Sequence, residues 1–264
     1  MFLYLIIATT LYSFPLILQA QSGQTAPTYV VLVGPPGSGK GTLSEQLTQQ
    51  SQLPVITTSQ VLKKLLQSNT VEAQKIKQQM AAGELISDET ILAIMKSEIS
   101  KPQYAAGAIF DGFPRTLAQT DFFTKNQLTV QVLVVLNISD EAIILRMQGR
   151  RVHGPSGRVY HVDNRPPKTP GIDDVTGEPL EQRSDDQPSV VESRLVQYRE
   201  ITKPVINWAN QQAMMTDGQV RQVINLDANQ SVAQMLQSLC QASTTQNSGQ
   251  LGCPAIKPMT TPAT

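Results

Sequence analysis

Short apolar runs alternate with amphipathic stretches along most of the chain. Five runs have the composition of strands: residues 29–33, 53–59, 106–110, 130–136 and 220–226. Runs rich in Val, Ile and Leu without polar alternation are typical of strands buried on both faces of a parallel sheet. Apolar residues at helical spacing lie between or after them, over residues 61–66, 71–82, 190–214 and 232–239 and in segments that Ser87 and Ser139 are expected to cap. The alternation predicts a three-layer α/β/α fold with a parallel five-stranded sheet, whose ligands lie beyond the carboxyl ends of the strands.

The alternation breaks at Gly149. Residues 149–186 are rich in Gly, Pro and charged side chains, and a turn over residues 154–157 separates two short segments that can pair as a hairpin. We therefore expect an inserted, β-rich flap in this part of the chain.

A glycine-rich loop over residues 34–42 follows the first predicted strand and precedes a helix-compatible segment that begins near Leu43. Its glycines let successive backbone N–H groups converge on an anion, Lys40 adds a point charge, and the helix N-terminus adds a partial positive charge. The loop therefore predicts a phosphate site and, with it, a nucleotide site. In the general P-loop pattern a hydroxyl residue follows the lysine directly, whereas here Gly41 intervenes and the hydroxyl comes at Thr42.

The composition indicates how an anionic ligand must be held. A hydrophobic content of 40% over 264 residues supports a packed interior. Lys plus Arg and Asp plus Glu both total 21, so no overall basic field would attract nucleic acid. Phosphates must instead be met by locally gathered arginines, and phosphoryl transfer needs such charges together with a lid that excludes water. Most candidates lie at the ends of predicted elements or in the flap: Arg115, Arg146, Arg150, Arg158, Arg183 and Arg194.

The two ends of the chain read differently from the rest. Residues 1–20 carry no charged side chain and resemble a secretory signal, with an uncleaved membrane anchor or another appendage as alternatives. Residues 240–264 are expected to be a low-complexity, disordered tail. Cys240 and Cys253 lie there. A disulfide between them would suit an oxidising compartment, and two unpaired thiols are the alternative.

Three further motifs give the chain a specific resemblance. They are the Asp-Gly-Phe-Pro-Arg-Thr sequence at residues 111–116, the Arg-rich hairpin region at residues 149–161 and the Asp-Asp-Val-Thr-Gly-Glu sequence at residues 173–178. Together with the P-loop carrying the extra Gly41, they resemble the signatures of adenylate kinase of the long-lid bacterial type. The resemblance covers about residues 28–239. It implies a monomer with an AMP-binding helical insert at residues 57–86 and a lid at residues 149–186, catalysing ATP + AMP ⇌ 2 ADP with Mg²⁺ and needing no obligate protein partner.

The resemblance also implies the residues of the site. The expected catalytic residues are Lys40, Arg115, Arg150, Arg183 and Arg194. The expected ATP contacts are Gly37, Ser38, Gly39, Lys40, Gly41, Thr42, Arg146, Arg150, Val159, Tyr160 and Asn225. The expected AMP contacts are Thr58, Lys63, Glu84, Leu85, Ile86, Gly112, Phe113, Pro114, Arg115, Gln119, Arg183 and Arg194. Asp111 would order Mg²⁺ through water, because magnesium keeps much of its hydration shell.

The chain departs from the family pattern at several positions. Gln60 stands where the family usually has an acid, and Lys63 stands where it has an arginine, so the AMP phosphate would meet a point charge instead of a bidentate fork. The lid has none of the four cysteines that bind zinc in many relatives. It resembles the version held by hydrogen bonds, through His153, Ser156, Asp173 and Thr176, so no structural zinc is expected.

Two other functions are compatible with these residues. One is a UMP/CMP kinase, although Thr58, Gln119 and the long lid favour adenine. The other is an exported nucleotide-binding protein with low turnover, which the signal-like N-terminus and Gln60 and Lys63 would fit. The retained arginines oppose it. The signal-like segment points to export or a periplasmic location, whereas relatives of this family are ordinarily cytoplasmic.

Overall fold

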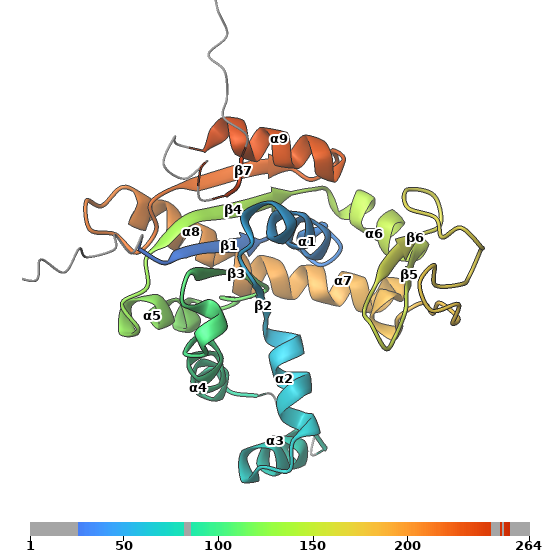
Figure 1. Cartoon of the computed structure of the whole chain (residues 1–264), viewed down its shortest axis with the longest axis horizontal. Coiled ribbons are helices and arrows are strands. Elements are labelled where there is room, and N and C mark those ends of the chain that lie inside the picture. The colour runs from blue at the N-terminus through green and yellow to red at the C-terminus, as the bar shows by residue number, and fades with distance from the viewer. Residues whose placement is uncertain (1–25, 82–85, 244–248, 250, 254–264) are drawn as a thin grey trace, which may run out of the picture.

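A central parallel sheet organises the protein (Figure 1). The computed structural model describes residues 26–81, 86–243, 249 and 251–253, so the signal-like residues 1–20 lie outside the described part. The five strands run in the order β2-β3-β1-β4-β7, and every pair is parallel. Their bounds are β1 Thr28–Val33, β2 Val55–Thr57, β3 Gly107–Asp111, β4 Val130–Asn137 and β7 Val223–Asp227. The predicted α/β fold with a five-stranded parallel sheet is confirmed.

The sheet is buried on both faces because alternate residues of each strand point to opposite sides. Val30 and Leu32 of β1 pack in one cluster with the helices α1 (Lys40–Ser51) and α9 (Val232–Ala242). Val31, one residue along, packs in a second cluster with α4 (Asp88–Ile99), α5 (Leu117–Lys125) and α8 (Lys203–Ala213). These two helical layers and the sheet between them form the three layers that the sequence predicts.

The second cluster contains a group of phenylalanines next to the Asp-Gly-Phe-Pro-Arg-Thr motif. Rings of Phe110, Phe113, Phe122 and Phe123 lie with centroids 5.1 to 6.2 Å apart. Phe122 and Phe123 belong to α5, a helix that the apolar pattern did not predict. Thr116 caps it by accepting a hydrogen bond from the backbone N–H of Gln119. The ring group therefore fixes the motif between β3 and α5.

Two parts of the chain extend from this core. At the bottom of Figure 1 lie α2 (Thr58–Gln67) and α3 (Val71–Ala81), which lead to α4. At the right of the figure, β5 (Arg150–Val152) and β6 (Val159–His161) form the predicted hairpin as an antiparallel pair. The predicted caps are also present, Ser87 on α4 and Ser139 on α6 (Asp140–Gly149).

The long helical stretch predicted over residues 190–214 is interrupted. The structure has α7 (Pro188–Gln197), one π-helical turn at Tyr198–Thr202 and then α8. A proline lies at the start of α8, where it has no N–H to continue the preceding hydrogen-bond ladder. The periodicity of apolar residues continued across this turn, so the pattern alone could not show the interruption.

Across the described residues, no helix has the length and apolar character needed to cross a membrane.

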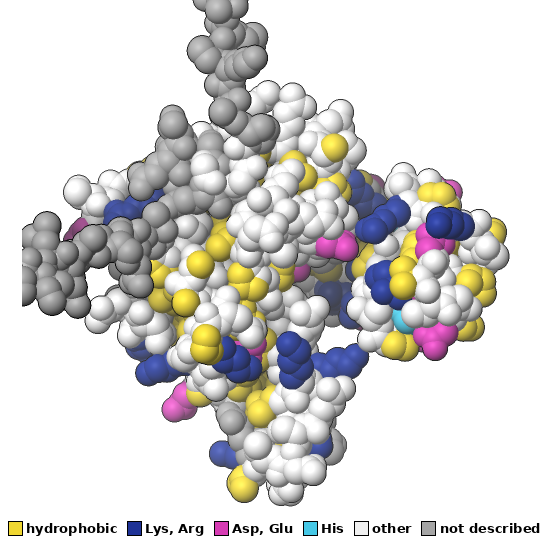
Figure 2. Space-filling view, in the orientation of Figure 1, with side chains coloured by type: hydrophobic (Ala, Val, Ile, Leu, Met, Phe, Trp, Pro, Cys, Tyr) yellow, Lys and Arg dark blue, Asp and Glu magenta, His cyan; other side chains and the backbone are white. Residues whose placement is uncertain are grey.

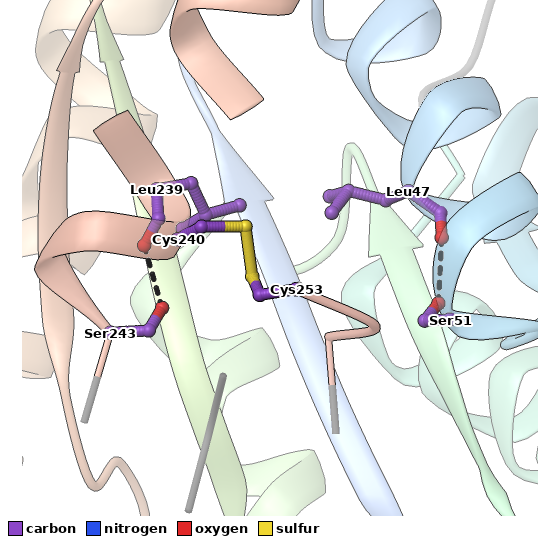
Figure 3. The surroundings of a disulfide bond; sticks show 6 residues. All are labelled: Leu47, Ser51, Leu239, Cys240, Ser243 and Cys253. Atoms are coloured by element: carbon purple, nitrogen blue, oxygen red, sulfur yellow. Dashed lines mark hydrogen bonds between the residues drawn. A yellow bond between two sulfur atoms is a disulfide. The ribbon is translucent and has the colours of Figure 1, made fainter. Parts of the chain in front are cut away.

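The C-terminal part is more ordered than expected. The last helix runs to Ala242, so Cys240 belongs to α9 and not to a tail. Cys240 and Cys253 form a disulfide with a Cα–Cα distance of 5.5 Å (Figure 3). Leu251 is buried among the residues packed around α1 and α9. The described residues 251–253 therefore lie against the core. The disulfide itself overturns the alternative of two unpaired thiols.

Candidate active site

The glycine-rich loop connects β1 to α1 at the carboxyl edge of the sheet. Gly37 and Gly39 have φ values of 77° and 96°, which side-chain-bearing residues rarely adopt. Gly39 is the N-cap of α1 and offers no side chain to its first turn. Because the first N–H groups of a helix have no partner within the helix, this terminus is open to an anion. The loop therefore has the backbone form of a phosphate site.

Lys40 is the first residue of α1, where the loop ends. Its Nζ donates to the carbonyl oxygens of Gly34 at 2.7 Å and Pro35 at 2.9 Å, which leaves one of its three donors for a ligand. Burial lowers the pKa of Lys40 to about 8; Asp111 opposes this shift, and Arg115 and Arg194 add to it. Burial also raises the pKa of Asp111, against the influence of Lys40. The loop thus holds a cation that lacks sufficient compensating negative charge.

A cleft of about 270 Å³ opens beside this lysine. Its wall combines the loop, the motif after β3, the first turn of α5, and the α7 helix with the π-helical turn. The predicted site residues among its lining are Lys40, Gly112, Pro114, Arg115, Gln119 and Arg194. Figure 2 shows Lys and Arg side chains around the hollow between the β5–β6 part and the rest of the molecule. The cleft therefore joins a phosphate loop to arginines and to one buried amide, that of Gln119.

Two neighbouring aspartates, Asp185 and Asp186, hold three of the predicted arginines by hydrogen bonds. Arg150 pairs with Asp186 through its Nε, at 2.8 Å from Oδ2, and through its terminal nitrogen. Arg183 and Arg194 both donate to Oδ2 of Asp185, each at 2.9 Å. Burial lowers the pKa of Arg194, and the charges of Arg150 and Arg183 lower it further. Lys40 and four arginines, Arg115, Arg150, Arg183 and Arg194, thus concentrate positive charge. They lie where the loop, α7 and the segment of residues 149–186, here called the hairpin segment, meet.

A sequence model of the family described as adenylate kinase matches residues 32–214, which is more than half of the chain. The chain belongs to the adenylate kinase family. It is therefore a nucleoside monophosphate kinase in the broad sense, a phosphotransferase that binds nucleotide substrates such as ATP and AMP. Kinases of this family generally use Mg²⁺ with ATP.

Four other residues that were predicted to contact AMP are described but do not line the cleft: Thr58, Lys63, Ile86 and Phe113. The Thr58 hydroxyl lies 3.4 Å from the carbonyl oxygen of Gly112, at the start of α2. Lys63 is exposed on the same helix, and Ile86 is half-buried before α4. Phe113 is buried in the phenylalanine group, and its packing there anchors the motif after β3 to the core. The two predicted residues 84 and 85 lie outside the described part of the chain.

Apart from Lys40, the predicted ATP contacts are not among the residues that line this cleft. Asn225 lies at a second hollow, formed where β4 and β7 end, with Asn137, Ile138, Ser139, Leu226, Asp227 and Asn229. Arg146 donates to the carbonyl oxygen of Ala228, next to this hollow. Val159 and Tyr160 belong to β6. The Tyr160 hydroxyl donates to Asp173 at 3.0 Å, so this side chain is committed to the interior of the hairpin segment.

The hairpin segment is held by a hydrogen-bond network. His153 lies 2.6 Å from the Ser156 hydroxyl, and Thr176 donates to Asp173 at 2.9 Å and lies 3.3 Å from His153. Arg158 binds Asp173 in two-pronged fashion at 2.8 and 2.6 Å. The Arg158 guanidinium holds the pKa of that carboxyl well below its usual range, and bonds from Thr176 and Tyr160 contribute. The four positions that resemble a hydrogen-bonded lid are thus joined, and Arg158 serves this network and not the cleft.

Three acidic residues of the site were missed from the sequence. Asp185 and Asp186 hold the arginines, and the available signal was their position two and three residues after Arg183. Asp88 was read only as a helix-favouring first-turn residue. The structure also places it against Gln119 and Thr116. Only the fold, which brings the first turn of α4 to that of α5, could show this contact.

The lowered pKa of Lys40 predicts proton uptake when ATP binds. Since the folded pKa of about 8 lies below the ordinary 10.5, the unfolded chain binds more protons between these values. In the free protein this group therefore raises the free energy of unfolding as pH rises from about 8 to 10.5. Phosphate oxygens near Nζ favour the ammonium form and raise its pKa again.

At pH 8 we expect uptake of about half a proton per bound ATP, because about half of the free molecules then carry neutral Lys40. Isothermal titration calorimetry in two buffers of different ionisation enthalpy measures this number. The Lys40→Met variant, titrated at higher concentration, should take up none. Equal uptake by both proteins would assign the proton to another group.

Proposed function

We propose that this kinase catalyses ATP + AMP ⇌ 2 ADP. The observation that carries the proposal is the position of Gln119 in the same cleft as Lys40, Arg115 and Arg194. An amide offers a donor and an acceptor side by side, which suits the edge of adenine. The cleft thus combines a group that can select a base with groups that can hold the phosphates of the same nucleotide.

Each substrate has its own set of residues in this proposal. AMP would lie along the cleft, with its base at Gln119, its phosphate near Arg115 and the exposed Lys63, and Thr58 and Ile86 alongside. The triphosphate of ATP would lie on residues 37–42. Its adenine would occupy the hollow at Asn225, where the planar cation of Arg146 can lie against a purine.

Positioning and charge neutralisation would supply most of the catalysis. Phosphoryl transfer needs the acceptor oxygen and the leaving oxygen roughly in line with the moving phosphorus, and charge spreads over the oxygens of the moving group. Arg150, Arg183 and Arg194 would turn from Asp185 and Asp186 to these oxygens, exchanging one anion for another. Closure of the segment of residues 149–186 over the loop would keep water from intercepting the phosphoryl group.

The residues next to the loop fit a magnesium ion held through water. Thr42 and Asp111 offer hard oxygen donors, and the Asp111 carboxylate lies close to Gly41, 3.7 Å from the position of an added Cβ. When bound with ATP, Mg²⁺ supplies neutralisation of negative charge on the phosphates. Asp111 would hold water molecules of its shell, and Lys40 would neutralise charge on the phosphates.

Acceptor preference tests the proposal. With Mg-ATP and AMP, UMP or CMP offered separately, we expect kcat/KM for AMP to be at least about tenfold higher than for either pyrimidine nucleotide, since a polar group left unpaired in a buried site is costly. A coupled assay of ADP formation measures it, with Arg115→Ala as a control for contaminating kinases. A preference for UMP or CMP would make the protein a pyrimidine nucleotide kinase. ATP binding without turnover of any acceptor would favour a nucleotide-binding role.

A further inference from the structure

The amide of Gln119 is held at both of its ends. Its Oε1 accepts from the backbone N–H of Arg115 at 2.7 Å, and its Nε2 donates to Oδ1 of Asp88 at 2.7 Å. The other carboxylate oxygen of Asp88 accepts from the Thr116 hydroxyl at 2.8 Å. Gln119 itself is only 6% exposed, so its amide has little water with which to exchange these bonds.

The two partners allow a single orientation of this amide. A carboxylate can only accept a hydrogen bond, and a backbone N–H can only donate one. Exchanging Oε1 and Nε2 by rotation of the side chain would set oxygen against carboxylate oxygen and N–H against N–H. Both bonds would then be lost in a buried place, where unpaired polar groups are costly.

We propose that Asp88 is a positioning residue that sets the base selectivity of the acceptor site by fixing the Gln119 amide. This inference rests on the proposed function. After binding Arg115 and Asp88, the amide retains one lone pair and one N–H. Adenine presents an amino donor beside a ring-nitrogen acceptor, which matches this pair. Hypoxanthine presents a carbonyl acceptor beside an N–H donor, the reverse pattern, and would need the excluded orientation.

Asp88→Asn tests the role of the carboxylate with little change of shape. The new amide can donate as well as accept, so it no longer restricts the Gln119 amide to one orientation. The bond to Gln119 also loses its charge assistance. With Mg-ATP and either IMP or AMP as acceptor, we expect the ratio of kcat/KM for IMP to that for AMP to rise about fivefold to tenfold. The KM for ATP should stay within about twofold, because Asp88 contacts no part of the P-loop in the described structure.

Three comparisons separate positioning from a structural role. Asp121→Asn removes an exposed carboxylate on α5, the helix that carries Gln119, and should leave the ratio unchanged. Thr116→Val breaks the other bond of Asp88 and the cap of α5, so it should lower stability without raising the ratio. In a Gln119→Ala background no amide remains to be oriented, so Asp88→Asn should no longer change the ratio.

The outcomes are distinguishable. A folded Asp88→Asn protein with the wild-type ratio overturns the inference, as does an equal rise in Thr116→Val. If Asp88→Asn does not fold by circular dichroism, Asp88→Ser carries the same expectation, because its hydroxyl can donate or accept. A wild-type protein that phosphorylates UMP or CMP but not AMP would overturn the proposed function, and this inference with it. Normal AMP turnover with an unchanged ratio would overturn this inference alone.

Discussion

Replacing Lys40 with methionine should lower kcat/KM for ATP about 10³-fold, because methionine keeps the length of the side chain and removes its charge. Lys40 is anchored by the carbonyl oxygens of Gly34 and Pro35, with one donor left to point at a ligand. A donor fixed before the reaction costs no reorganisation when charge develops on the transferring phosphate. The coupled assay with saturating acceptor measures this loss.

Lys125→Met is the matched control, since it removes one lysine from an exposed position on α5, far from the loop in sequence. It should retain wild-type kinetics. The melting temperature of Lys40→Met should not fall, because the free protein buries this cation at a cost. A loss of less than about tenfold in Lys40→Met would show that the loop backbone and the arginines hold the phosphates without it.

Removing the disulfide should have the largest effect on stability. The bond joins residues 13 apart, and closing a loop of this size in the unfolded chain corresponds to about 3 kcal/mol. For a chain of this length that free energy corresponds to a fall in melting temperature of roughly 5–10 °C. We expect this fall for Cys240→Ser combined with Cys253→Ser, measured by differential scanning calorimetry.

Reduction provides the control for that measurement. Dithiothreitol should lower the melting temperature of the wild type to that of the double variant and leave the variant unchanged. ADP formation at 25 °C should be similar in the wild type and the double variant. The cysteines lie beside α1 and α9 near Leu47 and Ser51, at the far end of α1 from Lys40 (Figure 3). An unchanged melting temperature after reduction would show that burial of Leu251 alone holds the segment.

The sheet and the loop could be predicted because their signals are local. β1 and β4 are uninterrupted apolar runs, and the glycines that permit φ values of 77° and 96° lie directly between β1 and α1. The caps Ser87 and Ser139 could be recognised for the same reason, since a cap and its helix are adjacent in sequence. Element types and the order of the motifs therefore followed from the residues themselves.

The parts that could not be predicted depend on contacts between distant residues. The α5 helix is fixed by packing of Phe122 and Phe123 on the ring of Phe110, which no spacing within α5 reveals. Asp88 meets Gln119 across 31 positions of sequence. The π-helical turn keeps the apolar periodicity of a regular helix, so its presence leaves no trace in the pattern. For α5 and for the Asp88–Gln119 contact, tertiary packing decides what the local sequence leaves open.

Because the disulfide follows the last strand of the sheet in sequence, it should affect how long the folded kinase persists more than how the kinase folds. All five strands of the sheet end by Asp227, so each has been synthesised before Cys253 joins the chain. Since the amino-terminal parts of a domain are available first, the sheet and the loop can form while both sulfurs are still thiols. Oxidation then acts on a nearly finished molecule. It should lengthen the lifetime of the native state under heat or proteolysis more than it changes the yield of folding.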